Sequence, residues 1–119
     1  LMLDDKRGPY SRHDGSCKTC YGGVTINSAD YKTIVKNSHW FDCAHASVAL
    51  KPGARRMKIK TFDLPSGLEI QMYLNTDNTV GVLICNNSSK EQDFVFASTK
   101  QTVKYKVPAK SLASLIWQE

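Results

Sequence analysis

Apolar and polar residues alternate with a period of two over much of the chain after residue 53. In residues 68–75 the apolar positions Leu68, Ile70, Met72 and Leu74 alternate with Glu69, Gln71, Tyr73 and Asn75. This pattern predicts a strand with one buried face and one wet face. Residues 80–85 are apolar at nearly every position, which predicts a central strand that is covered on both faces.

Further short strands are predicted on either side of this pair. Phe94 and Phe96 share one face of a strand, and residues 103–107 and 112–117 complete the set, with turn signals such as Thr76-Asp77-Asn78 between strands. Residues 24–26 are predicted to form another short strand, and residues 31–35 are predicted to be extended. Short strands separated by turns at intervals of roughly ten residues predict a mainly β chain, an antiparallel β-sandwich of about six to eight strands.

Residues 38–50 change to a helical period. Trp40, Phe41, Ala44 and Val48 lie on one stripe of the predicted helix. Asn37 or Ser38 supplies an N-cap oxygen, and Lys51-Pro52-Gly53 ends the helix.

The first 23 residues combine a short apolar stretch with a long loop. Leu1 to Asp4 resembles the end of an apolar strand, so we expect additional chain before it. Residues 5–23 hold Gly8-Pro9, Asp14-Gly15 and Gly22-Gly23, which predict a loop. A loop of this length in a compact domain is often functional, so it is a candidate binding rim.

Composition narrows the class of protein. The chain has 119 residues, 41% of them hydrophobic, which suits one modest core. No apolar run approaches the roughly 18 residues of a membrane helix. The net charge is +5, but Lys104 and Lys106 alternate with apolar residues as on the wet face of a strand, so we predict no nucleic-acid partner.

The cysteines do not predict a metal site. Cys17 and Cys20 have the spacing of a zinc knuckle and His13 is a possible third ligand, but a second cysteine pair is missing. Cys43 in the helix and Cys85 in an apolar strand are interpreted as small buried thiols.

No catalytic constellation is evident. Glycoside hydrolysis requires two carboxyl groups on either side of the bond. Glu69, Glu91 and Glu119 lie on a wet strand face, after a turn and at the chain end, so they are not expected to converge. His45 lies two residues from Cys43 and from Ser47, which directs them to different sides of a helix. We predict no cofactor.

Three stretches in order resemble family 30 glycoside hydrolases, of glucosylceramidase-like and endo-β-1,6-glucanase-like type. They are Leu1-Met2-Leu3-Asp4-Asp5-Lys6-Arg7-Gly8-Pro9, then Trp40-Phe41 with His45-Ala46-Ser47 and Lys51-Pro52-Gly53-Ala54-Arg55, then Val82 to Lys90 with Pro108-Ala109-Lys110-Ser111 and Ile116-Trp117. The resemblance implies a parent enzyme with a (β/α)8 barrel whose two catalytic glutamates lie upstream of Leu1. It also implies a parent that is secreted, periplasmic or lysosomal.

The resemblance implies two parts in this chain. Residues 1–53 would be the last strand, loop and helix of the barrel, and residues 54–119 the C-terminal β-sandwich. The loop would follow the eighth barrel strand, whose end faces the active site. We therefore expect a rim of the sugar cleft here, although the loop can equally cross the barrel mouth without a role. The rim candidates are Asp4, Asp5, Tyr10, Arg12 and His13.

Two functions remain open. In the first, the chain completes a retaining β-glycosidase and braces its barrel, with the β-linked glycan or glycolipid bound by the parent. In the second, it is a free-standing carbohydrate-binding sandwich that stacks sugars on Tyr73, Trp40 or Trp117. Without the barrel and with strands missing from the sandwich, we expect uncovered apolar surface and self-association.

Overall fold

The computed structural model describes residues 2–6, 22–98 and 100–118. By its internal contacts the chain divides into two compact units, Leu1–Ala44 and His45–Glu119.

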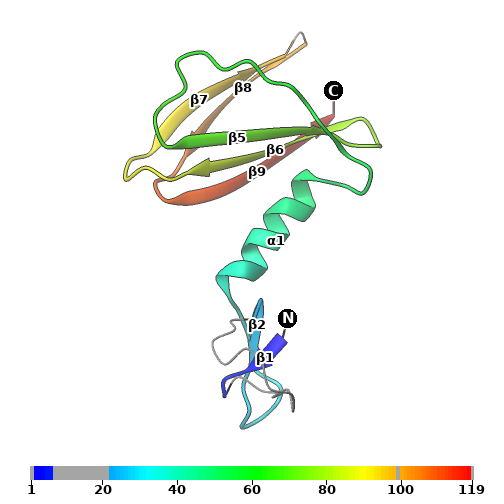
Figure 1. Ribbon diagram of the computed structural model, residues 1–119, viewed down its shortest axis with the longest axis vertical. Coiled ribbons are helices and arrows are strands. Elements are labelled where there is room, and N and C mark those ends of the chain that lie inside the picture. The colour runs from blue at the N-terminus through cyan, green and yellow to red at the C-terminus, as the bar shows by residue number, and fades with distance from the viewer. Residues whose placement is uncertain (1, 7–21, 99, 119) are drawn as a thin grey trace, which may run out of the picture. The chain divides into compact units, whose positions relative to one another are not determined.

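The first unit contains a small sheet of three strands (Figure 1). β1 (Met2–Asp4) runs parallel to β2 (Val24–Ile26), which pairs antiparallel with β3 (Ile34–Lys36). The predicted strands at the start of the chain and at residues 24–26 are therefore confirmed. The buried Asn37 holds the end of this sheet, because its side-chain amide donates to the Gly22 carbonyl oxygen and to Thr25 Oγ1, both at 2.9 Å.

The helix α1 (Ser38–Ala49) confirms the helix predicted from the period and begins in the first unit. Its apolar stripe is not a core stripe. Trp40, Phe41 and Val48 are 37%, 50% and 48% exposed, whereas Ala49 is fully buried. Apolar surface is thus left uncovered along this helix, as the sequence predicted.

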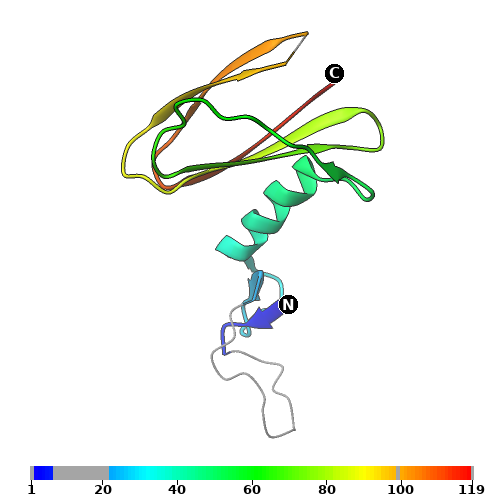
Figure 2. The same ribbon diagram turned by 45° about the horizontal axis from the view of Figure 1, so that its top comes forward.

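The second unit is a β-sandwich, which confirms the predicted fold class. Its first sheet has the order β4-β5-β6-β9, with every neighbouring pair antiparallel, and its second sheet is the β7-β8 hairpin (Figures 1 and 2). The strands are β4 (Arg55–Arg56), β5 (Leu68–Leu74), β6 (Thr79–Asn86), β7 (Gln92–Ala97), β8 (Thr102–Val107) and β9 (Ser111–Gln118).

The core lies between the two sheets and follows from strand register. Ile84 of β6 stands opposite Ile70 of β5 and Ala113 of β9, so one face of the sheet is apolar across three strands. Phe94 and Val107 close the core from the second sheet. The buried apolar residues of this cluster are Leu68, Met72, Val80, Val82, Ile84, Phe94, Val107 and Ala113.

Three sequence-based interpretations were wrong. Cys43 and Cys85 are exposed, so neither is a buried thiol. Cys85 stands on the outer face of β6. The sequence predicted that both faces of this strand are covered, but the outer face is covered over only part of its length. Asn75 was placed on the wet face of a strand, yet it is only 2% exposed, because it binds the end of α1.

The end of α1 covers the outer face of the sheet at Gly81. A Cβ atom built on Gly81 would lie 1.8 Å from the carbonyl oxygen of Ala49. Beside this contact, His45 Nδ1 lies 2.9 Å from Ser114 Oγ of β9. The helix backbone therefore rests directly on the sheet, and only glycine allows this approach.

Replacing Gly81 with alanine tests this contact. The added methyl group meets backbone, which cannot move away as a flexible side chain could, so Gly81→Ala is expected to lower the free energy of unfolding by about 3 kcal/mol or more. Urea unfolding followed by circular dichroism measures the change. Glu69→Ala, at an exposed position of the neighbouring strand, is the control and should change stability by less than about 0.5 kcal/mol. Equal stability of the two variants would contradict the contact.

Candidate functional site

The end of α1 is bound to the β5–β6 turn by one buried asparagine. Asn75 Nδ2 donates to the Ala49 carbonyl oxygen at 3.2 Å and to Thr79 Oγ1 at 3.0 Å. Its Oδ1 accepts the Lys51 backbone N–H at 2.9 Å. One side chain thus satisfies a carbonyl at the helix end and an N–H just beyond it, groups that no helical bond would satisfy.

A second layer of polar contacts surrounds Asn75. Asp77 forms an ion pair with Lys51 and accepts the Thr79 hydroxyl at 2.7 Å. The hydrogen bond from Lys51 first, and that from Thr79 next, lower the pKa of Asp77 to about 2. We call this set of residues the helix joint: Ala49, Lys51, Asn75, Asp77, Thr79 and Gly81.

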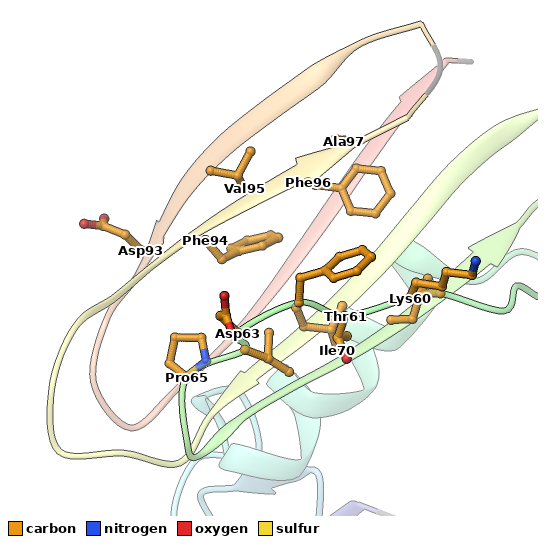
Figure 3. A pocket seen from close by; sticks show the side chains of 13 residues that line it. Lys60, Thr61, Asp63, Pro65, Ile70, Asp93, Phe94, Val95, Phe96 and Ala97 are labelled. Carbon is orange, nitrogen blue, oxygen red and sulfur yellow. The ribbon is translucent and has the colours of Figure 1, made fainter.

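A groove of about 440 Å³ opens beside the β7 strand (Figure 3). One wall is the segment from Ile59 to Pro65, the other is β7 from Asp93 to Ala97, and Ile70 of β5 also lines it. The lining is largely apolar, and Phe62 on the rim is 85% exposed. A groove with an uncovered aromatic ring is a candidate binding surface.

Two carboxylates line this groove, which makes it the place to test for glycosidase chemistry. They do not converge. Figure 3 shows the Asp63 side chain directed toward β7, while the Asp93 side chain points away from the opposite segment. Asp93 instead lies 3.9 Å from Lys106 Nζ and is 75% exposed. A pair that holds a glycosidic bond between its oxygens is therefore not formed here.

The aromatic residues predicted to stack on sugars differ in how much of each ring is already in contact with other side chains. Trp117 packs on Phe96 with ring centroids 5.1 Å apart, next to the core. Trp40 has Lys36 Nζ over its ring at 3.9 Å, so one face is occupied. The Tyr73 hydroxyl donates a hydrogen bond to Gln71 Oε1 on the outer face of β5, and Tyr73 is partly exposed. Sequence reasoning did not identify Phe62, whose exposure is visible only in the structure.

Of the predicted rim residues, the structure describes Asp4 and Asp5. Asp4 Oδ1 accepts the Lys6 N–H at 3.0 Å, and Asp5 Oδ1 accepts the Ser28 N–H at 2.7 Å. Hydrogen bonds from Ser28 lower the pKa of Asp5. Both carboxylates therefore hold turns of the first unit. The remaining candidates Tyr10, Arg12 and His13 lie outside the described residues, as do Cys17 and Cys20.

In the part of the chain that the structure describes, no group of three or more His, Cys, Asp or Glu residues could hold a metal ion. Likewise, α1 is neither long nor apolar enough to cross a membrane.

The fold and these surfaces define an antiparallel β-sandwich unit with a helix bound to its outer face. Residues 53–115 match the family model described as the glycosyl hydrolase family 30 beta sandwich domain. The chain belongs to glycosyl hydrolase family 30, as the resemblance predicted. A search of curated protein sequences returned no match.

Solved structures agree with this assignment. The endo-β1,6-glucanase BT3312 matches with a TM-score of 0.90 and 39% identity, over 100% of this chain and 26% of its own. SrfJ from Salmonella typhimurium matches with a TM-score of 0.83 and 21% identity, over 100% of this chain and 25% of its own, which shows the fold alone. This chain thus spans about a quarter of each of these proteins.

The ion pair of the helix joint predicts a pH dependence of stability. The folded pKa of Asp77 is about 2, below its ordinary 3.8. A lowered folded pKa stabilises the fold above the unfolded pKa, and this stabilisation is lost as the pH falls through the folded value. Between about pH 4 and pH 2 the free energy of unfolding should therefore fall less steeply in Asp77→Asn than in the wild type, as urea unfolding at several pH values would measure. Identical slopes would contradict the role of Asp77, and Asp63→Asn is the control.

Proposed function

We propose that this chain is the C-terminal portion of a retaining β-glycosidase, in which its sandwich braces a catalytic barrel. The groups that cleave the sugar linkage belong to another part of that longer protein. The family assignment and the unconverged carboxylates of the groove support this division. The endo-β1,6-glucanase among the solved structures favours a β-linked glucan as the substrate of the parent.

The observation that carries the proposal is the helix joint. α1 is a single helix that contributes residues to both units, and its last residues are bound to the sandwich sheet through Asn75 and Gly81. In the parent, a barrel helix that ends in this joint is proposed to be anchored on the sandwich by the hydrogen bonds of Asn75 and by the close backbone contact at Gly81.

The uncovered apolar side chains fit a brace. Val48 on α1 is 48% exposed and Ile116 on the outer face of β9 is 40% exposed. Trp40 and Phe41, in the first unit, are also exposed. In the parent these side chains are proposed to pack against barrel helices, and in the isolated chain they favour self-association.

The remaining parts of the proposal concern the first 53 residues. We place the boundary of the barrel end at residues 1–53 and the sandwich at 54–119, which is supported by the start of the family match at residue 53. Asp4, Asp5 and the loop with Tyr10, Arg12 and His13 are proposed to rim the sugar cleft. The parent is proposed to act in a secreted, periplasmic or lysosomal setting.

The second candidate function is a carbohydrate-binding module. The groove favours it, because the exposed ring of Phe62 offers a stacking surface and Asp63 has a carboxylate for hydroxyl groups. This function needs no barrel and predicts saturable binding of an oligosaccharide by the chain alone.

Assay and titration of this chain separate the candidates. Under the brace proposal we expect no hydrolysis of aryl β-glucosides above buffer and no saturable binding of β-1,6-gluco-oligosaccharides in calorimetry. Turnover that disappears in Asp63→Asn would overturn the division of labour. Saturable binding that is lost in Phe62→Ala and kept in Phe41→Ala would favour the second candidate.

A chimera tests the brace directly. This chain would replace the matching C-terminal quarter of the endo-β1,6-glucanase, and the chimera should hydrolyse β-1,6-glucan. Asn75→Ala leaves the Ala49 carbonyl and the Lys51 N–H unsatisfied, at a cost of about 1–3 kcal/mol. It should lower the Tm of the chimera by about 2 °C or more while kcat/KM at low temperature stays unchanged.

The matched control for the chimera is Asn87→Ala, which removes an exposed asparagine from the other end of the sheet. The Tm of the Asn87→Ala chimera should equal that of the unsubstituted chimera within about 1 °C. An inactive or insoluble chimera, or equal Tm values for the two variants, would contradict the brace.

A further inference from the structure

The β7 strand has one edge without a partner strand in the part of the chain described here. β7 pairs with β8 on one side only, and the groove runs along its other side. An open strand edge offers a row of N–H and C=O groups to any extended chain that can reach it. The groove provides the room for such a chain.

The groups offered by this edge can be assigned from the hairpin. Ser98 N–H donates to the Gln101 carbonyl oxygen at 2.8 Å, so this pair is hydrogen-bonded across the hairpin. Hydrogen-bonded and non-hydrogen-bonded pairs alternate along an antiparallel ladder. With the observed register, Ala97, Val95 and Asp93 are then non-hydrogen-bonded toward β8. Their backbone groups point to the open edge.

The side chains on this edge do not prevent pairing. Proteins commonly protect open edges with lysine or other charged residues. Lys104 and Lys106 stand on β8, and Arg55 and Arg56 form β4. In contrast, β7 carries the single charge of Asp93 and exposes Val95 by 59%.

The sequence of β7 is suited to pair with itself. In an antiparallel pair centred on Val95, Val95 faces Val95 of the second copy, and Asp93 faces Ala97. The two aspartates are therefore kept apart, and like charges do not meet. All three residues whose backbone groups point outward become hydrogen-bonded pairs in this register. Phe94 faces Phe96 on the inner side.

We propose that the isolated chain forms a two-fold dimer by antiparallel pairing of β7 with β7 of a second copy. The dimer joins the two hairpins into one sheet of the order β8-β7-β7-β8. This inference rests on the self-association proposed above, but it assigns the dimer contact to the β7 edge instead of to the exposed apolar side chains of α1 and β9. The symmetric register is what an isologous two-fold interface requires, since the same edge is used by both copies.

Cysteine cross-linking tests the register. In a chain whose four native cysteines are replaced by serine, Val95→Cys should form a disulfide-linked dimer under mild oxidation, because Cα atoms of a hydrogen-bonded pair lie about 5.5 Å apart. Asp93→Cys alone should give at least about tenfold less dimer. A mixture of Asp93→Cys and Ala97→Cys should restore it. Equal cross-linking of Val95→Cys and Asp93→Cys would overturn the register.

Sedimentation tests the surface without cross-links. Val95→Lys places a charge on the edge and should weaken the dimer at least about tenfold while leaving the circular dichroism spectrum unchanged, since Val95 is exposed. Ile116→Lys, on the outer face of β9, should leave the dimer intact. Loss of the dimer in Ile116→Lys alone would overturn the β7 edge while self-association stands. A monomeric wild type would overturn both, and the chimera tests the brace independently.

Discussion

The contact between Gly81 and the carbonyl oxygen of Ala49 is the constraint on which the arrangement of the second unit depends. It sets how closely the end of α1 approaches the sheet, because no other residue at position 81 leaves room for the helix backbone. Once the helix backbone lies there, the carbonyl of Ala49 and the N–H of Lys51 are removed from water and need partners. Asn75 supplies both, which explains why an asparagine is buried directly after the alternating strand β5.

The joint and the sandwich core lie on opposite faces of the same strands. Val80, Val82 and Ile84 of β6 point into the core, while Gly81 between them receives the helix. Strain introduced at one face is therefore transmitted to the other through a short, closely packed strand. This geometry makes the sandwich suitable as a support for a helix, and it gives the proposed brace a physical route.

Two kinds of surface are uncovered among the residues that the structure describes, and they have different physical origins. On α1 and β9 the exposed groups are apolar side chains, which are costly in water in proportion to their area. On β7 the open edge consists of backbone groups, which are directional and demand a strand in one register. The first kind fits a broad packing partner such as a barrel helix. The second kind fits an extended chain.

The pattern of residues determined the sandwich, because alternation with a period of two specifies which face of each strand is buried. The helical period also determined α1, whereas the family and the apolar side chains left exposed on that helix were predicted from the resemblance to family 30 glycoside hydrolases. Tertiary structure alone decided the rest. The alternation predicts that Asn75 is exposed and that Cys85 is buried. The opposite is observed, because the end of α1 covers only part of the outer face of the sheet. Asp63 and Asp93 are thirty residues apart, so only the folded chain shows that they line one groove without converging. Local pattern records which side a residue faces, whereas what covers that side depends on distant segments.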